Sequence, residues 1–251
     1  MPSSSKPSSK SAPASRKVPA NYAIGQETRS ALLAAATDVF LEHGFRAARV
    51  QDIAERASIR LSAINYHFGG KEGLYLAVLQ QHADAAIEHL PLTPPDPGLP
   101  LKERFAFVVR ALAYRMLDTT SPSRIGPLLV REVVSPTAAL DVMFERFTKP
   151  QAQVLMGLVS EILSAGEKPA VVPPDVLLRA MLSVVGQCMM YRVGMPLVER
   201  LNPAFLQRKA WLDEVVAHVV DFSWAGLQAM AKQRSKLAAA GKTKSAGRKS
   251  S

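Results

Sequence analysis

The residues most suited to specific chemistry lie in one stretch, from Val50 to Leu79, which reads VQDIAERASIRLSAINYHFGGKEGLYLAVL. Its apolar residues recur at spacings that let two short helices cross at a steep angle, with the small Ala54 at their closest approach. That arrangement is a helix-turn-helix, whose second helix enters the major groove of DNA. We expect the second helix at 61–68, and its outward residues would be Arg60, Ser62, Ala63, Asn65, Tyr66 and His67.

The chemistry that these outward residues favour is recognition of duplex DNA. The major groove presents a distinct pattern of donors and acceptors for each base pair, which hydrogen-bonding side chains on a helix can read. Asn65 is suited to an adenine edge and Arg60 to a guanine edge. A helix pair of this kind can also be purely structural or bind a protein, so the interpretation depends on the flanking sequence as well.

The elements that position this stretch are predicted to be helices. From Glu27 to Asp221 the apolar residues follow a helical period and no run alternates as in a strand, so we predict an all-α fold. Gly44, followed by the apolar Phe45, is expected to end the first helix in the left-handed conformation. The expected helices are 28–43, 50–57, 61–68, 71–90, 101–119, 125–134, 137–148, 151–165, 175–193 and 204–232.

The net charge of +10 is concentrated in the two ends of the chain. Residues 1–20 and 231–251 contain eleven lysines and arginines and no acidic residue, so residues 21–230 carry a net charge of about −1. Both ends are rich in Ser, Ala, Pro and Lys, a composition that cannot bury much apolar surface, and we expect them to be disordered. Such tails either add sequence-independent affinity for phosphates or only keep the protein soluble.

The helix-turn-helix stretch and its surroundings resemble the N-terminal signature of the TetR family of bacterial transcription factors. The resemblance implies that Tyr66 and Lys71 hold backbone phosphates, that the head of the second helix reads bases, and that a homodimer binds a palindromic double-stranded DNA operator. The block LLVREVVSPTAALDVMFERFTKP, 128–150, resembles the CecR-like subgroup and implies a dimeric, ligand-sensing domain. The residues that carry the N-terminal resemblance are Phe40, Gly44-Phe45, Asp52-Ile53-Ala54, Ile64, Tyr66-His67-Phe68 and Lys71-Glu72.

Three positions depart from that signature. Arg49 and Arg60 stand where Ser, Thr or Asn usually accepts the free N–H groups at a helix start, and an arginine cannot accept them. Either neighbours or water supply these caps, or both arginines face DNA phosphates, which adds Arg49 to the candidate DNA-binding residues. Ser58 stands at a turn position where glycine is common, and a left-handed backbone there would add about 1–2 kcal/mol of strain.

The chain divides into four parts on these grounds. We expect a basic tail at 1–22, a TetR-type helix-turn-helix domain at 23–75, a helical ligand-sensing and dimerisation domain at 76–232, and a second basic tail at 233–251. The segment 91–100 contains five prolines, which no helix tolerates, and it separates the helix after the DNA-binding domain from those that follow.

The last two long helices are candidates for the dimer interface. The first helix carries apolar residues at every fourth position, and the second is rich in apolar residues. Both groups of residues could instead face the core of their own subunit. The two sets are Val176, Ala180, Val184 and Cys188, and Leu212, Val215, Val219, Phe222 and Trp224.

An unknown small, apolar ligand would bind inside this same half. Methionines and aromatic residues suit a permissive apolar pocket, although each of them is more often ordinary core. Arg131 and Glu132 could place charge near the ligand or the hinge, with a surface pair as the alternative. The candidate pocket residues are Phe105, Leu112, Met116, Met143, Phe144, Phe147, Met181, Cys188, Met189 and Tyr191.

Other classes of function find no support in the sequence. There is no nucleophile elbow, HExxH pair, glycine-rich phosphate loop or cysteine-based metal site, so we predict no enzyme, cofactor or metal. His82 and His89 lie too far apart along one helix to share a metal ion. No apolar stretch is long enough to cross a membrane and no signal peptide is evident, so we expect a cytoplasmic protein without a membrane partner. We therefore predict a ligand-responsive repressor, and the alternative is a low-specificity DNA-architectural protein that uses its lysine-rich tails.

Overall fold

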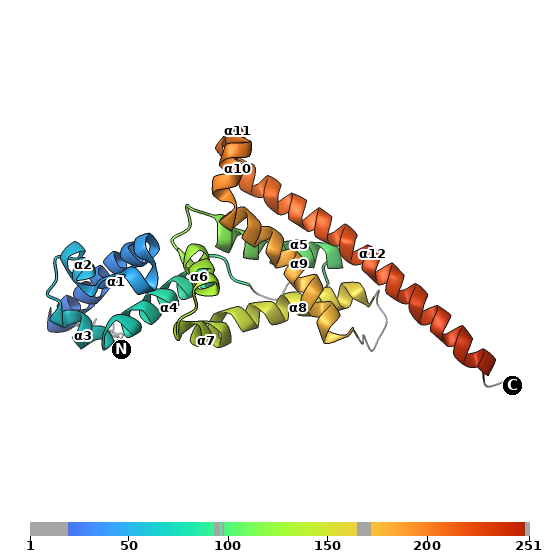
Figure 1. Cartoon of the computed structure of the whole chain (residues 1–251), viewed down its shortest axis with the longest axis horizontal. Coiled ribbons are helices and arrows are strands. Elements are labelled where there is room, and N and C mark those ends of the chain that lie inside the picture. Colours follow the sequence, from blue (N-terminus) through green and yellow to red (C-terminus); the bar gives the residue numbers. More distant parts are fainter. Residues whose placement is uncertain (1–19, 93–95, 97, 165–171, 249–251) are drawn as a thin grey trace, which may run out of the picture.

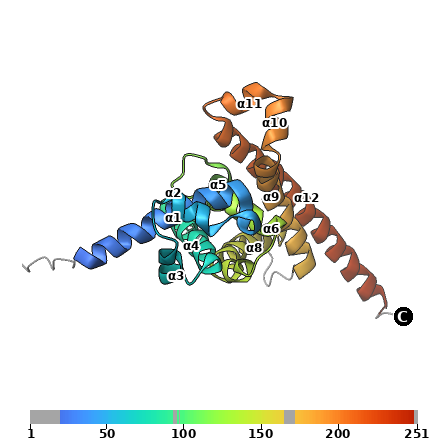
Figure 2. The same ribbon diagram turned by 60° about the vertical axis from the view of Figure 1, so that its left-hand side comes forward.

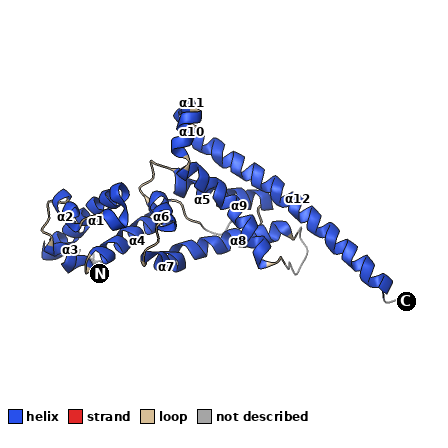
Figure 3. Cartoon of the chain, viewed as in Figure 1, coloured by secondary structure: helices blue, strands red, loops and turns tan. Residues whose placement is uncertain are grey.

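The computed structural model describes residues 20–92, 96, 98–164 and 172–248, and for residues 20–23 and 238–248 it describes only the backbone. Within these ranges every regular element is a helix, which confirms the predicted all-α fold (Figure 3). The elements are α1 (Ala20–Ala47), α2 (Val50–Arg56), α3 (Ser62–Phe68), α4 (Lys71–His89), α5 (Leu101–Leu117), α6 (Ile125–Val134), α7 (Ala139–Met143), the π-helical turn η1 (Phe144–Thr148), α8 (Lys149–Leu163), α9 (Pro174–Val193), α10 (Met195–Leu201), α11 (Pro203–Gln207) and α12 (Trp211–Arg248).

Helices α1 to α4 gather at one end of the molecule and share a hydrophobic core, which we call the N-terminal core (Figure 1). The inward faces recur every three or four residues, as the helical period predicted. Burying one large apolar side chain stabilises the fold by about 1.5–3 kcal/mol, so this core fixes the angle between α2 and α3. Its fully buried members include Leu32, Val39, Phe40, Ile53, Ile64, Leu74 and Leu79.

A second hydrophobic core, the C-terminal core, is built from α5, α8, α9 and α12. Helices α9 and α12 each contact both α5 and α8. The far end of α12 projects beyond the other helices in two views (Figures 1 and 2). Buried members of this core include Phe105, Val109, Leu155, Val159, Val184 and Val219.

Helices α6 and α7 join the N-terminal core, although they follow α5 in the sequence. Ile125 and Leu128 of α6, Met143 of α7 and Phe147 of η1 are buried in that core. Two helices from the expected domain 76–232 therefore pack into the core of the expected domain 23–75. Periodicity indicates which face of a helix is buried but not which helix covers it, so the sequence could not predict this crossing.

Several expected helix limits were wrong. The first helix begins at Ala20 instead of 28, and the helices expected at 137–148 and 151–165 are joined, because α7 continues through η1 into α8. Pro150 is tolerated because it occupies the first turn of α8, where its missing N–H has no helical partner. The expected helix 204–232 is divided at the extended Arg208 into α11 and α12.

The expected disordered tail at 233–251 was also wrong over most of its length, because α12 continues to Arg248. Alanine, lysine and arginine are among the best helix formers, which explains how a composition without apolar periodicity continues a helix. The expected basic tail at 1–22 lies outside the described residues up to residue 19, and residues 20–22 belong to α1.

Helix α9 is long and apolar enough to span a membrane by length and composition alone, which the sequence reading did not anticipate. A single helix of this kind is weak evidence for a membrane protein, since core helices of soluble proteins pass the same test. Buried residues of α9, namely Ala180, Val184 and Cys188, face the C-terminal core.

Candidate functional site

Helix α3 lies at the surface of the N-terminal core with one face buried and the other open. Ile64 is fully buried and Phe68 is half-buried beneath Arg29, whose guanidinium lies 5.3 Å from the ring centroid. Tyr66 on the opposite face is 85% exposed, and Ser62 and Asn65 are exposed beside it. The helix thus presents a hydroxyl, a carboxamide and a phenol to its surroundings.

The other residues expected to face DNA are placed less uniformly. Arg49 and Arg60 are exposed at the starts of α2 and α3, whereas Ala63 packs partly against the N-terminal core. His67 is half-buried, and its ring makes contacts with the neighbouring rings of Tyr66 and Phe68. The expected DNA-binding residues that lie open to a partner molecule are therefore Arg49, Arg60, Ser62, Asn65 and Tyr66.

Helix α2 begins without a side-chain cap at Arg49, as predicted, whereas the uncapped N-cap residue of α3 is Leu61 and Arg60 lies one residue before it. The first turn of α3 is closed by the Ala63 N–H, which donates to the Arg60 carbonyl at 3.0 Å. Ser58, in the turn between the two helices, has a φ of 54° and is the one non-glycine with positive φ in the part of the chain that the structure describes. The turn therefore contains the strain that the sequence suggested.

Lys71, expected to hold a phosphate, is tied to the end of α1. Its Nζ donates to the Arg46 carbonyl at 3.2 Å and lies 4.8 Å from the centroid of the Phe45 ring. A lysine has three N–H donors, so two remain for other acceptors. The side chain sits at the first residue of α4, where its position is fixed by α1.

Glycines fix how closely α3 approaches α4. Gly69 ends α3 with a φ of 73°, and Gly70 follows with a φ of 127°, conformations that other residues rarely adopt. A Cβ on Gly73 would lie 1.9 Å from the Phe68 carbonyl oxygen, so no side chain fits there. The sequence reading missed Gly73, although a glycine inside a predicted helix was a signal for such a close approach.

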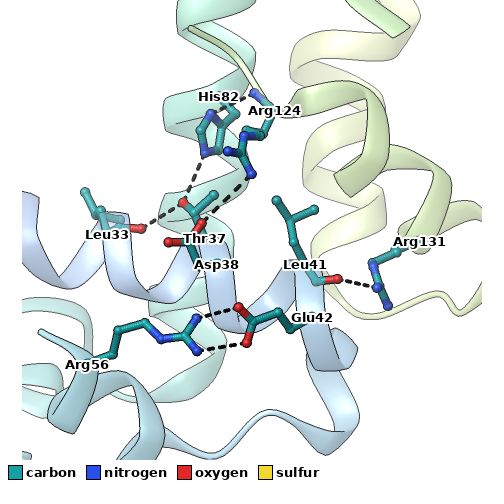
Figure 4. A network of polar contacts seen from close by, with 9 residues as sticks. All are labelled: Leu33, Thr37, Asp38, Leu41, Glu42, Arg56, His82, Arg124 and Arg131. Carbon is teal, nitrogen blue, oxygen red and sulfur yellow. Dashed lines mark hydrogen bonds and ion pairs between the residues drawn. The ribbon is translucent and has the colours of Figure 1, made fainter. Parts of the chain in front are cut away.

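A buried polar chain connects α6 to α1 through His82 of α4 (Figure 4). The Arg124 N–H donates to His82 Nδ1 at 3.1 Å, so His82 Nε2–H donates to the Thr37 hydroxyl at 3.0 Å. The Thr37 hydroxyl in turn donates to the Leu33 carbonyl at 2.8 Å. When the imidazole is neutral, each N–H or O–H that Arg124, His82 and Thr37 contribute to this row of hydrogen bonds has an acceptor. Burial lowers the pKa of His82, which favours that neutral form.

Two arginines of the C-terminal half also reach α1 at this junction (Figure 4). Arg131 of α6 donates to the Leu41 carbonyl, and Arg124 lies 3.9 Å from the Asp38 carboxylate. Gly44 interrupts α1 nearby with φ 74° and ψ 168°, so its φ is positive as predicted but its ψ is not that of a left-handed helix. Below them, Arg56 of α2 forms a bidentate ion pair with Glu42.

Glu132 is not part of a surface pair, so the alternative given for Arg131 and Glu132 was wrong. The side chain is 1% exposed and accepts a hydrogen bond from the Tyr75 hydroxyl at 2.9 Å. The N–H and hydroxyl of Thr137 also donate to its carboxylate. Arg131 points instead to α1, so both residues hold α6 against the N-terminal core.

Several of the expected pocket residues surround one cavity of about 320 Å³ between α5, α6, η1, α8 and α9. Its walls are largely apolar, with Arg115, Thr148 and Gln151 as the polar exceptions. The expected residues that line it are Leu112, Met116, Phe144, Phe147, Met181 and Met189.

The remaining four expected pocket residues lie elsewhere. Phe105 and Cys188 are buried in the C-terminal core, and Met143 in the N-terminal core. Burial raises the pKa of the Cys188 thiol to about 11, so the thiol stays protonated at neutral pH. Tyr191 stacks on Phe205. No group of three His, Cys, Asp or Glu side chains that could hold a metal ion occurs in the described ranges.

The stripes expected to form a dimer interface mostly face the subunit's own core. Val184 and Cys188 of α9 and Val219 of α12 are buried there. Of the expected residues Phe222 is exposed, and the same two helices also expose Leu178, Leu182, Met190 and Val193. A helix that is apolar on two faces gives no sequence signal for which face is inside, and for most of these residues the structure supports the alternative that they face their own core.

Two protein families match separate parts of the chain. Residues 32–78 match the family described as bacterial regulatory proteins, tetR family, and residues 101–227 match the C-terminal domain of the HTH-type transcriptional dual regulator CecR. The first range holds α2, α3 and the beginning of α4, and the second holds the cavity.

Individual proteins support the same assignment. The chain is 30% identical to the HTH-type transcriptional dual regulator CecR of Shigella flexneri over 57% of its own length and 67% of that protein. It is 47% identical to the HTH-type transcriptional activator FasR of Mycolicibacterium smegmatis, over 23% of this chain and 26% of FasR. A solved TetR-like transcriptional regulator from Rhodococcus sp. RHA1 shares the fold, with a TM-score of 0.50, 19% identity, and coverage of 82% of this chain and 94% of that one.

Proposed function

Because this chain belongs to the TetR family of bacterial transcriptional regulators, and to its CecR-like branch, we propose that it is a ligand-responsive repressor that binds a palindromic operator as a homodimer. The observation that carries the proposal is the open face of α3, which is held at a fixed angle by a buried core and presents Asn65 and Tyr66.

Contacts with DNA would divide by chemistry. Asn65 and Arg60 would read base edges, because a carboxamide suits adenine and a guanidinium suits guanine. Tyr66, Ser62, His67 and Arg49 would contact the backbone, which fixes register without specifying sequence. The two free N–H groups of Lys71 would bind a phosphate at the N-terminus of α4, where the helix dipole also favours an anion.

A second copy of the chain would cover the exposed apolar faces of α9 and α12. Two recognition helices must stand about 34–36 Å apart, or a multiple of this, to read a palindrome from one side of the duplex. Leu178 and Phe222 are about half and two-thirds exposed, at 48% and 66%, and a second copy that packed on these helices would remove such apolar side chains from water.

Ligand binding would act on the DNA-binding helices α2 and α3 of each subunit through α6 as well as α4. Ile125 and Gly126 at the start of α6 line the cavity, and the adjacent Arg124 N–H bonds to His82. A ligand that binds more tightly to one position of α6 would favour one distance between the α3 helices of the two subunits. Its effect on operator affinity cannot exceed the difference between its affinities for the two positions of α6.

The experiment begins with selection of bound DNA from a random pool. A regulator should yield a palindrome and prefer it to random DNA by about 10³-fold or more. Binding to random DNA within about tenfold of the selected site would favour the architectural alternative. A reporter fused to the selected site then distinguishes a repressor from an activator.

A pair of variants tests the role of α3 directly. Asn65→Ala should weaken binding to the selected site by about 5- to 150-fold, since one base contact contributes about 1–3 kcal/mol. Gln81→Ala removes an equally exposed carboxamide from α4 and serves as the control. Equal effects of the two variants would contradict the proposed readout.

A further inference from the structure

The cavity contains a buried guanidinium that has only neutral partners. Arg115 of α5 is 8% exposed and lines the cavity. One of its terminal nitrogens donates to Gln151 Oε1 and the other to the Leu90 carbonyl at 2.6 Å. Its Nε is buried without a hydrogen-bond partner.

In the part of the chain that the structure describes, no carboxylate neutralises this charge. Among the described residues Arg115 forms no ion pair, and burial alone lowers its pKa to about 10. Asp118 borders a neighbouring hollow, but its carboxylate accepts hydrogen bonds from the N–H and hydroxyl of Thr120. Arg104, on the same helix, shows the usual solution, since it is paired with Glu161. A buried charge without a counter-ion is costly, so Arg115 is an exception that calls for a partner.

The surroundings of Arg115 are positively charged on one side and apolar on the other. Arg115 and Met116 also line a second hollow of about 520 Å³, at the junction with α1. The half-buried Arg192 also lines that hollow. It makes no hydrogen bond or ion pair with any residue that the structure describes. Leu112, Phe147 and Met181 line the cavity on the other side.

We propose that the ligand is an amphipathic organic anion, whose acidic group binds the Arg115 guanidinium while its apolar body fills the cavity of about 320 Å³. This inference rests on the proposed ligand response and replaces a purely apolar ligand with a charged one. Each terminal nitrogen of Arg115 has a second N–H besides the one donated to Gln151 or Leu90, so a carboxylate could accept from it and supply the missing counter-charge, whereas a neutral apolar ligand leaves the charge without a counter-ion. The acid would lie beside the α6 residues that hold α1.

The test compares ligands that differ only in charge. Alkyl carboxylates of six to twelve carbons and the matching primary alcohols are titrated into the full-length protein at pH 7.5, without DNA, by calorimetry. Wild-type protein should bind the best carboxylate about 10- to 100-fold more tightly than its alcohol, since a hydrogen bond to a charged group is worth this much. Equal affinities, or no carboxylate binding at all, would overturn the proposal without any variant.

Variants then assign the preference to Arg115. Arg115→Met should remove the preference for the carboxylate while retaining the alcohol, and Arg115→Lys should keep part of it. Arg104→Met on the same helix is the control and should keep all of it, because its guanidinium already has Glu161. A wild-type preference that survives in Arg115→Met would overturn the assignment.

The outcome is separable from that of the proposed function. Tight carboxylate binding through Arg115 with unchanged operator affinity would uphold the ligand class and contradict ligand-dependent release. If no carboxylate binds, the proposed ligand class is contradicted. The measured affinity for the selected DNA site, on which the proposed DNA-binding function depends, would not change.

Discussion

The two hydrophobic cores differ in how completely this chain covers them. Around the N-terminal core, α1 to α4 expose few large apolar side chains, and the most exposed of these is Tyr66 on the proposed DNA-binding face. Around the C-terminal core, α9 and α12 leave Leu182, Met190, Val193 and Phe222 exposed. The comparison teaches that α1 to α4 cover most of their apolar surface within one chain, whereas α9 and α12 leave apolar surface that a second copy and a ligand would cover.

Polar contacts differ between the two regions in the same way. The contacts that attach α6 to the N-terminal core include buried ones at Thr37, His82 and Glu132, besides the exposed contacts of Arg124 and Arg131. The ion pairs of the C-terminal half join exposed residues, such as Lys102 with Asp221 and Arg110 with Asp213. Exposed pairs contribute about 0–1 kcal/mol, so loss of a polar group should matter more at the junction.

The largest expected effect separates the two regions at helical glycines. Gly73→Ala should destabilise the protein by about 3 kcal/mol or more, since its Cβ would lie 1.9 Å from the Phe68 carbonyl and α3 would have to move. Gly157→Ala in α8 meets nothing within 4 Å and should stabilise the protein by about 0.5–1 kcal/mol. Urea denaturation measures both free energies of unfolding. A stable Gly73→Ala variant with full operator affinity would contradict the fixed contact between α3 and α4.

The sequence predicted the N-terminal region in detail because its chemistry is local. The spacing of Ile53, Ala54 and Ile64 fixes two short helices, and their crossing needs no distant partner. The uncapped start of α2 at Arg49 and the positive φ at Ser58 also followed from single residues.

The sequence failed where distant elements decide the outcome. Phe105 and Leu112 lie on one face of the same helix by period, yet the first is core and the second lines the cavity. Whether a residue of α5 lies in the core or lines the cavity depends on how α6, η1 and α8 surround α5. No local sequence pattern predicts that arrangement. Arg115 was missed because an arginine in an amphipathic helix normally reaches solvent.

A matched pair of tyrosines tests the difference between buried and exposed polar contacts. Tyr75→Phe should destabilise the protein by about 1.5–3 kcal/mol, because the buried Glu132 loses a hydrogen bond that water cannot replace. Tyr114→Phe removes a hydroxyl that donates to the exposed Asp213 at 2.6 Å and should cost less than about 1 kcal/mol. Thermal and urea unfolding compare them. Equal losses would remove the distinction between the two regions.

A pH dependence is expected at the junction. Burial, helped by Arg124 and opposed by Asp38, lowers the pKa of His82 below its ordinary value of about 6.5. The stability that neutral His82 provides is therefore complete above about pH 6.5, and it is lost as the pH falls, because the unfolded chain takes up the proton first. Between pH 7 and 5.5 the loss should reach up to about 1 kcal/mol.

Two variants assign this pH dependence. His82→Gln should remove the dependence when free energies of unfolding are measured at each pH. Thr37→Val keeps the imidazole, so it should be less stable at every pH and retain the dependence. An unchanged slope in His82→Gln would show that other groups cause it.

The smallest effect tests whether strain in the DNA-binding region is local. Ser58→Gly should stabilise the protein by about 0.5–1 kcal/mol, because relief of the left-handed φ of 54° exceeds the entropy that glycine adds to the unfolded chain. Ser62→Gly, at the start of α3, should destabilise it by a similar amount, since the same replacement in helical backbone only adds that entropy. Opposite signs from two serines four residues apart would locate the strain in the turn itself. Destabilisation by both would mean that the turn needs serine, and that the N-terminal region does not contain this strain.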